Sequence, residues 1–532
     1  MNIKELFEYW CTFDEDTKNE FLSLTDEKEI EDRFYKELEF GTGGLRGIMG
    51  AGPNRMNRYT IAKATKGYAD YLKSRFDDEI SVAIAYDSRN NSQYFSQVAA
   101  GVLSANGIKV YIYDTLMPTP VLSFTVKHLG CNGGIVLTAS HNPKEYNGYK
   151  IYDEKGCQLV PQFASQVIEF VNAVTDLKSV AVDDFETAVK DGKITVIGED
   201  VLDEFLNEVK KQSIYEEKSD LKIVYTALHG TGNIPVRKAL EGMNVSIVKS
   251  QELPDGNFST VRSPNPEEKD ALTLGIEQAK LENADLVLGT DPDCDRVGTA
   301  VLHNGEYVLV TGNQIGALLV DFVLSHKKDT LNEKSTLVKT IVTSEVGADI
   351  ARSYGLNVVD TLTGFKYIGD QIGKYEINGD KEFVIGYEES YGYLVGTHAR
   401  DKDAVVSSML ICQMAAYHKN NGRTLIDALD TFVLKGKDGA EKIQSIMTNM
   451  RENGQSLFDN INNVLDYSKG IDDLPKENVL KYTFTDGSWM AVRPSGTEPK
   501  LKVYYSMCGE TREAATERLE NVRAVLKNVI EG

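Results

Sequence analysis

The stretch SVAIAYDSRNNSQYFSQVAAGVLSANGIKVYIYDTLMPTPVLSFTVKHLGCNGGIVLTASHNP, residues 81–143, contains three short apolar runs separated by two longer amphipathic segments. The runs have the length and the β-branched composition of strands, whereas the segments between them have the length of helices. Strands that alternate with helices in this way favour a parallel sheet covered by helices. This part of the chain is therefore predicted to be α/β.

The same alternation returns twice. It appears as LKIVYTA, VSIVKS and DLVLGTD within residues 221–291, and as STLVKTIV, NVVDTL and EFVIGYE within residues 335–388. After residue 436 the pattern changes to strand-like runs followed by one long helical segment. A chain of 532 residues exceeds what one hydrophobic core usually serves. We expect three similar α/β domains and a smaller α+β domain, with the divisions 1–208, 209–318, 319–436 and 437–532.

Composition excludes several classes of protein. The formal net charge of −22 would repel a nucleic-acid backbone, so we expect no nucleic-acid partner. The six cysteines are scattered singly, which is typical of a reducing cytoplasm. The N-terminus lacks the basic start and apolar core of a secretory signal, and no long uncharged span follows. We expect a cytoplasmic protein that is neither exported nor inserted in a membrane.

The segment Thr138-Ala-Ser-His-Asn-Pro143 follows an apolar run, so Ser140 is predicted on a turn at the carboxyl end of a strand. Sheets of α/β proteins bind ligands at such ends. Ser, Asn and Pro also favour turns that have no function, and the motif alone does not separate the two interpretations. Lys150 follows an Asn-Gly pair that predicts a tight return toward the serine, where a lysine could carry a proton; a solvated surface lysine is the alternative.

The segment Asp291-Pro-Asp293-Cys-Asp295-Arg296 also follows a strand-like run. Its three carboxylates repel one another unless a cation lies among them. An EF-hand is excluded, because its sixth and twelfth loop positions would be Arg296 and Leu302 instead of Gly and Glu. A single Mg²⁺ fits better, and a solvated acidic turn is the alternative. The cysteine between the acids suggests a site sensitive to oxidation.

Further loops carry polar side chains suited to a phosphosugar. Glu388 and Ser390 in GYEESYG (386–392) suit sugar hydroxyls, although paired glutamates also suit a helix N-terminus. Arg493 in RPSGTEPK (493–500) can form two parallel hydrogen bonds to a phosphate, although Pro and Gly also favour a hairpin loop without a ligand. GTGGLRG (41–47) and TGFK (363–366) are smaller loops, each with one basic residue. The histidines lack zinc-ligand spacing.

Taken together and in this order, TASHNP, DPDCDR, GYEESYG and RPSGTEPK resemble the four signature loops of the α-D-phosphohexomutase superfamily, one loop per domain. The resemblance covers essentially the whole chain, and GTGGLRGIMGAGPNRMN resembles the branch that contains bacterial phosphoglucomutases and phosphopentomutases. It implies a heart-shaped molecule of four domains, three α/β and one smaller α+β, around a central cleft. It implies an isomerase that acts through a phosphoserine.

The resemblance also implies roles for particular residues. Ser140 would carry the phosphoryl group and, with Asp291, Asp293 and Asp295, bind one Mg²⁺. The residues around the transferring group would be Arg46, His141, Lys150 and Arg296. The substrate-binding residues would be Gly364, Lys366, Glu388, Ser390, Lys402, Arg493, Ser495, Gly496 and Thr497. Lys402, in Asp-Lys-Asp, rivals Lys150 as the proton-transfer group, and we favour Lys150.

The expected reaction interconverts glucose 1-phosphate and glucose 6-phosphate, with glucose 1,6-bisphosphate as intermediate and activator. A phosphopentomutase or phosphomannomutase with the same machinery is the first alternative. A phosphosugar-binding protein without turnover is an alternative of another class, and a metal-dependent phosphatase is a third. The expected partner is a small phosphosugar, and the chain is expected to be a monomer or a homodimer.

Overall fold

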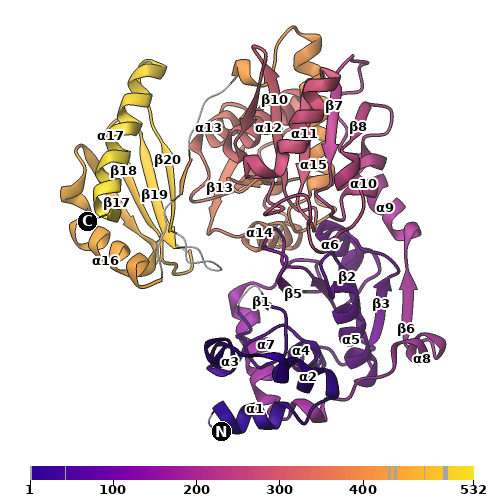
Figure 1. Cartoon of the computed structure of the whole chain (residues 1–532). Coiled ribbons are helices and arrows are strands. Elements are labelled where there is room, and N and C mark those ends of the chain that lie inside the picture. Colours follow the sequence, from indigo (N-terminus) through magenta and orange to yellow (C-terminus); the bar gives the residue numbers. More distant parts are fainter. Residues whose placement is uncertain are drawn as a thin grey trace.

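The computed structural model describes residues 3–41, 44–428, 433–435, 440–471, 474–494 and 501–531. These residues form four β-sheets, each with its own helices (Figure 1). The N-terminal sheet lies at the bottom of the view, two further α/β units lie above it, and the C-terminal sheet lies to one side. The expectation of three α/β domains and a smaller α+β domain is confirmed.

Domain I begins with three short helices that precede its sheet. Its elements are α1 (Ile3–Trp10), α2 (Glu15–Ser23), α3 (Glu27–Phe34), β1 (Leu45–Ile48), α4 (Arg58–Arg75), β2 (Ser81–Tyr86), α5 (Ser92–Ala105), β3 (Lys109–Tyr113), α6 (Thr119–His128), β4 (Gly133–Leu137), β5 (Tyr146–Tyr152), α7 (Pro161–Ala173), α8 (Phe185–Lys190), β6 (Ile194–Ile197) and α9 (Glu199–Lys210). The first three helices share a small aromatic core around Phe7, Phe21 and Phe34.

Domains II and III follow with fewer elements. Domain II contains β7 (Lys222–Thr226), α10 (Asn233–Ala239), β8 (Asn244–Ile247), α11 (Lys269–Glu282), β9 (Leu286–Thr290), β10 (Val297–His303) and β11 (Glu306–Val310). Domain III contains α12 (Gly312–Lys327), β12 (Ser335–Thr340), α13 (Glu345–Ser353), β13 (Asn357–Thr361), α14 (Phe365–Asn378), β14 (Glu382–Glu388), β15 (Gly392–Val395) and α15 (Ala404–Asn420).

The three α/β sheets share one topology. Their common strands run in the orders β5-β4-β2-β3, β10-β9-β7-β8 and β15-β14-β12-β13. In each sheet three strands are parallel, and the fourth, which follows the third in sequence, pairs with it antiparallel. The chain therefore contains a structural repeat, although its sequence shows no clean internal repeat.

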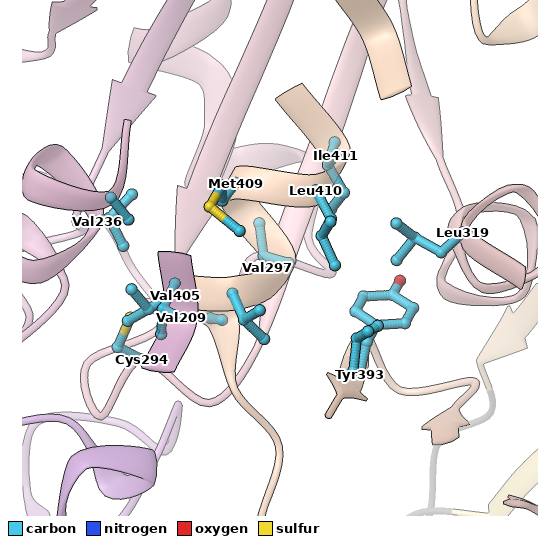
Figure 2. Packing of buried hydrophobic residues seen from close by; sticks show 14 of the residues in the cluster. Val209, Val236, Cys294, Val297, Leu319, Tyr393, Val405, Met409, Leu410 and Ile411 are labelled. Atoms are coloured by element: carbon cyan, nitrogen blue, oxygen red, sulfur yellow. The ribbon is translucent and has the colours of Figure 1, made fainter. Parts of the chain in front are cut away.

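Domains II and III share a continuous apolar core with part of domain I. Figure 2 shows α15 contributing Val405, Met409 and Ile411 to this core, which also includes Val236 of α10 and Leu319 of α12. Every residue of α15 from Ala404 to Ala416 is buried, as expected for a helix that is covered all around. This packing fixes the loops at the ends of the two neighbouring sheets relative to each other.

The C-terminal domain has an antiparallel sheet covered by two helices. Its elements are β16 (Val433–Lys435), α16 (Ala440–Leu457), β17 (Ile461–Asp466), β18 (Leu480–Phe484), β19 (Trp489–Pro494), β20 (Leu501–Ser506) and α17 (Arg512–Glu531). One group of apolar residues joins the sheet to α16 and α17. A second group, with Trp489 and Tyr504, packs against Ile341, Val342 and Leu362 of domain III.

The exact domain boundaries stay a prediction. Residue 208 lies near the end of α9, residue 318 lies within α12, and residue 436 lies outside the described residues. In the described part of the chain, none of the helices has the length and apolar character that crossing a membrane requires.

Candidate active site

The predicted motif loops occupy equivalent places in the repeated fold. Residues 138–145 connect β4 to β5, residues 291–296 connect β9 to β10, and residues 389–391 connect β14 to β15. Each loop therefore follows the third of the strands that the three sheets share, at the carboxyl end where α/β sheets place ligands. The structural repeat explains why motifs so far apart in the sequence have the same local setting.

Ser140 lies at the contact between domains I and II. Its Oγ donates a hydrogen bond to Oδ2 of Asp291 at 2.9 Å and lies 3.1 Å from Nδ1 of His141. The serine is 3% exposed, and its backbone has a φ of 52°, in the left-handed region that non-glycine residues seldom adopt. Its N–H donates to Oγ1 of Thr138 at 2.8 Å, which supports the turn. The fold thus brings the hydroxyl of one domain to the acids of the next.

Asp291, Asp293 and Asp295 form a buried cluster whose ligand oxygens lie within 4.8 Å of one another. Oδ1 of Asp291 accepts the backbone N–H groups of Asp295 and Arg296, each at 3.0 Å, which curls the loop around this carboxylate. Burial, followed by repulsion from Asp295 and Asp293, raises the pKa of Asp291 well above its usual range. A cation among the carboxylates would relieve this repulsion.

The donor set fits a hard divalent ion. Oδ1 of Asp293 and Oδ1 of Asp295 are buried and have no hydrogen-bond partner among the described residues. Buried carboxylate oxygens are costly unless a cation or donor satisfies them. Oxygen ligands from a few carboxylates, completed by phosphate or water, are what Mg²⁺ prefers. The acidic cluster is thus a site able to hold a metal ion.

Two lysines contact the acids of domain II, one from domain I and one from domain III. Lys150 of β5 lies 2.8 Å from Oδ2 of Asp293, and Lys402, which precedes α15, lies 3.0 Å from Oδ2 of Asp295. Burial lowers the pKa of both lysines, but the larger combined effect of nearby carboxylates raises it above the ordinary value. Asp401, which accepts from Tyr152 at 2.8 Å, is one of the acids beside Lys402. Both candidates for proton transfer therefore reach the same cluster.

The predicted arginines and histidine surround the serine loop. Arg46 of β1 donates to Oδ1 of Asn142 at 3.3 Å. Arg296 pairs with Glu267, and its Nε lies 3.8 Å from Asp295. Burial, and then the positive charges of Arg296 and Arg46, lower the pKa of His141 well below its usual range, so the imidazole is neutral near pH 7. A neutral imidazole can accept or donate a hydrogen bond beside the serine.

The predicted sugar loop and the Lys366 loop are joined by a hydrogen bond. The N–H of Gly364 donates to Oε1 of Glu388 at 2.7 Å. Burial raises the pKa of Glu388, and the charge of Lys402 opposes that effect. Ser390 lies half-buried in the turn between β14 and β15. Lys366 lies in the first turn of α14, where burial lowers its pKa.

The C-terminal domain reaches this region through Arg493. Its guanidinium donates to Oγ1 of Thr363 at 2.9 Å and lies 3.7 Å from Glu477. The arginine therefore lies next to the loop that carries Gly364 and Lys366. Ser495, Gly496 and Thr497 lie outside the described residues.

Sequence reasoning missed two residues of this site. Thr119 begins α6 and holds Asp293 twice, through its N–H to the backbone oxygen at 2.9 Å and through its Oγ1 to Oδ2 at 2.8 Å. Lys502 of β20 lies near enough to His141 to lower its pKa, and burial lowers the pKa of Lys502 itself. The prolines around Thr119 signal a helix start, but no local pattern links either residue to the acids.

The expectation that Cys294 exposes the acids to oxidation is wrong. Its side chain is fully buried and belongs to the apolar core that includes Val405 and Val297 (Figure 2). Cys294 has a φ of 52°, in the left-handed region, and lies in the apolar core while the neighbouring acids form the polar cluster. Burial also raises the pKa of the thiol well above its usual range, so the reactive thiolate is disfavoured.

Comparison with known families assigns all four parts of the chain. Models described as phosphoglucomutase/phosphomannomutase alpha/beta/alpha domain I, domain II, domain III and C-terminal domain match residues 37–178, 203–305, 311–433 and 437–524.

Individual proteins are similar to this chain in sequence or in fold. The phosphoglucomutase of Staphylococcus saprophyticus is 37% identical over 538 residues, covering 94% of this chain and 96% of the relative. The structure of a phosphoglucomutase/phosphomannomutase family protein from Burkholderia thailandensis is similar in fold, with a TM-score of 0.69, 18% identity and coverage of 92% of this chain and 96% of that one. Aspergillus fumigatus N-acetylphosphoglucosamine mutase, solved with GlcNAc-6P and magnesium, has a TM-score of 0.51 and 14% identity, with coverage of 98% and 99%. The chain belongs to the phosphoglucomutase/phosphomannomutase family.

Proposed function

We propose that this chain is a phosphoglucomutase that interconverts glucose 1-phosphate and glucose 6-phosphate through a phosphorylated Ser140. One observation carries the proposal: the Ser140 hydroxyl of domain I lies 2.9 Å from Asp291 of domain II, in a buried cluster of acids that can hold a metal ion. The assignment of the sugar draws on the phosphoglucomutase relatives, which cover most of the chain.

Two opposite transfers make up the reaction. The bond between phosphorus and Oγ of Ser140 breaks while the free hydroxyl of the sugar phosphate forms a new bond to the same phosphorus, which gives glucose 1,6-bisphosphate. The bisphosphate then turns around, and its other phosphoryl group returns to Ser140. The proton lost by the sugar hydroxyl in the first transfer is given back to the leaving sugar oxygen in the second.

The residues around Ser140 would have different roles in the phosphoryl transfer. The three aspartates would hold Mg²⁺, and the bound ion would supply positive charge that stabilises the negative charge of the phosphoryl group during transfer. Arg46 and Arg296 would add positive charge beside the serine loop. Against the effect of burial, the carboxylates of Asp293 and Asp295 raise the pKa of Lys150 in the ion-free protein, and a cation bound to them would offset this effect, so that Lys150 would take and return the proton. The buried setting of Ser140 supports this scheme, because water must be excluded for a phosphoserine to persist.

The remaining residues would bind the substrate in both orientations. Glu388 and Ser390 would bind sugar hydroxyls, and Gly364, Lys366 and Lys402 would line the same region. Arg493, with Ser495, Gly496 and Thr497, would grip the phosphate that does not react. We also propose a cytoplasmic location and a monomeric or homodimeric state, which sedimentation of the purified chain would decide.

A substrate panel tests the proposed function. Purified protein with Mg²⁺ and glucose 1,6-bisphosphate is expected to convert glucose 1-phosphate with a higher kcat/KM than ribose 1-phosphate or mannose 1-phosphate. A preference for either of the others would assign the corresponding phosphopentomutase or phosphomannomutase activity. Release of inorganic phosphate without isomerisation would identify a phosphatase, and binding without any turnover would identify a phosphosugar-binding protein.

The choice between the two lysines gives a further prediction. Lys150→Met is expected to lower kcat by about 10²–10⁴-fold, because a positioned acid or base contributes that much. Lys402→Met is expected to lower kcat less and to raise KM. Lys127→Met, which removes an exposed lysine paired with Glu376, serves as the control. Steady-state kinetics with bisphosphate present would measure all three, and a larger loss of kcat in Lys402→Met would reverse the assignment.

A further inference from the structure

A buried arginine supports the serine loop through hydrogen bonds to its backbone. Arg89 follows β2, and its side chain is fully buried. Its guanidinium donates to four backbone carbonyls of one short segment, those of Ser140, Asn142, Pro143 and Tyr146. The bonds to Pro143 and Tyr146 measure 2.9 and 3.1 Å. Arg89 touches neither the acids nor the Ser140 hydroxyl in these bonds, so its link to the site runs through the loop backbone.

The guanidinium itself is held in place by its neighbours. Oδ1 of Asp87 accepts the backbone N–H of Arg89 at 2.9 Å, and Oδ2 of Asp87 lies 3.4 Å from its Nε. The ring of Phe258, from domain II, lies 5.0 Å from the guanidinium and closes the space on that side. A charge buried this deeply is costly unless it is paired and hydrogen-bonded. Arg89 is paired with Asp87, and both terminal nitrogens of its guanidinium donate hydrogen bonds, whereas its Nε has no hydrogen-bond partner among the described residues.

The loop needs such support because of its backbone. Ser140 is in the left-handed region, with a φ of 52°, and such a conformation persists only where the surroundings fix it. The carbonyl of Ser140 points to Arg89 while its hydroxyl points to Asp291. The planar fork of arginine reaches several acceptors at fixed angles, which an ammonium group does not reproduce.

The other two α/β domains support their equivalent loops from the same place. In domain II, Thr231 follows the first strand and donates to the carbonyl of Pro292 from its N–H at 2.9 Å and from its Oγ1 at 3.0 Å. In domain III, the hydroxyls of Thr340 and Thr343 donate to Glu389 at 3.3 and 3.2 Å. In each repeat, the end of the first common strand (β2, β7 or β12) or the loop after it thus supports the motif loop, and domain I uses a charged side chain for this contact.

We propose that Arg89 is a positioning residue that holds the Ser140 loop in the conformation required to accept and donate the phosphoryl group. The proposal rests on the proposed function for its kinetic part, while its structural part concerns the loop alone. Two separate measurements can therefore test it. One is the rate at which Ser140 takes a phosphate from glucose 1,6-bisphosphate, followed by rapid quench and intact mass. The other is amide hydrogen exchange of a peptide that covers residues 139–147.

Arg89→Lys and Arg89→Ala are compared with Arg33→Lys, a matched variant in which another buried arginine of domain I loses its bond to the backbone oxygen of Ala51. In Arg89→Lys, phosphate uptake is expected to fall about 10²-fold, since a small misplacement of reacting groups has effects of that size. KM is expected to stay within about twofold, because binding residues are unchanged. Residues 139–147 are expected to exchange faster, and added guanidinium is expected to restore part of the uptake in Arg89→Ala.

Uptake and loop exchange in Arg89→Lys equal to those of Arg33→Lys would overturn the proposal. Faster exchange with unchanged uptake would overturn the catalytic part of it. A wild-type protein that takes no phosphate on Ser140 would refute the proposed function instead, and loop exchange would still decide whether Arg89 positions the loop. Should Arg89→Ala fail to fold, Arg89→Lys carries both measurements.

Discussion

Replacing Ser140 by alanine is expected to lower kcat by about 10⁴-fold or more, because covalent catalysis loses its only acceptor for the phosphoryl group. The hydroxyl also donates to Asp291, so the variant loses one hydrogen bond between domains I and II. Intact mass after incubation with glucose 1,6-bisphosphate is expected to show one added phosphate in the wild type and none in the variant. Coupled conversion of glucose 1-phosphate measures the loss of activity.

A second substitution separates chemistry from folding. Ser140→Gly also lacks the hydroxyl, but glycine adopts a positive φ without strain, so this variant keeps the loop conformation. Ser165→Ala, which removes an exposed hydroxyl on α7, is the control and is expected to keep full activity. Wild-type turnover in either Ser140 variant would show that the phosphoryl group does not pass through this residue.

Removing divalent ions is expected to abolish turnover and to lower the melting temperature, and added Mg²⁺ is expected to restore both. An ion that binds only the folded state stabilises it by about 2.7 kcal/mol when the free ion concentration is about a hundred times the Kd. Asp293→Asn is expected to weaken Mg²⁺ binding and to lower kcat strongly, because one charged ligand is lost and Lys150 loses its partner. Calorimetric titration with Mg²⁺ and thermal unfolding measure these effects.

The effect of pH on this binding has a definite sign. Burial and the neighbouring acids raise the pKa of Asp291 in the ion-free protein, so a proton competes with the metal ion at low pH. A carboxyl group whose folded-state pKa is raised destabilises the ion-free fold as the pH increases through its unfolded-state value. We therefore expect Mg²⁺ to bind more tightly, and to stabilise the protein more, as the pH rises.

A control and a contrary result complete this test. Asp349→Asn removes an exposed carboxylate that pairs with Arg352 and is expected to leave Mg²⁺ binding unchanged, because exposed ion pairs contribute little. Full activity after exhaustive chelation, or Mg²⁺ affinity in Asp293→Asn equal to that of the wild type, would contradict the assignment of the acids.

Local patterns in the sequence predicted the elements and the motifs. The runs at 81–87, 109–114 and 133–140 contain β2, β3 and β4, because buried parallel strands are apolar throughout. The motifs that contain Ser140 and Asp291 were predicted at strand ends. The first directly follows β4, and the second directly follows β9.

Other features depend on contacts that no local pattern encodes. The two threonines that donate to Glu389, and Lys502 beside His141, come from segments with ordinary strand or loop composition. Arg89 has the sequence context of a polar turn, and only its burial against the loop of Ser140 gives it a role. The fate of the Cys294 thiol was predicted wrongly for the same reason, since burial depends on helix α15, more than a hundred residues away.

The sequence by itself determined the α/β alternation, the turn that carries Ser140 and the clustering of acids at 291–295, because strand periodicity and turn chemistry act between near neighbours. Only the tertiary structure decided that the serine meets Asp291 at 2.9 Å, that both lysines reach the acids and that Arg89 holds the loop. Those contacts join separate domains or separate strands, and their distances follow from how the sheets pack against one another.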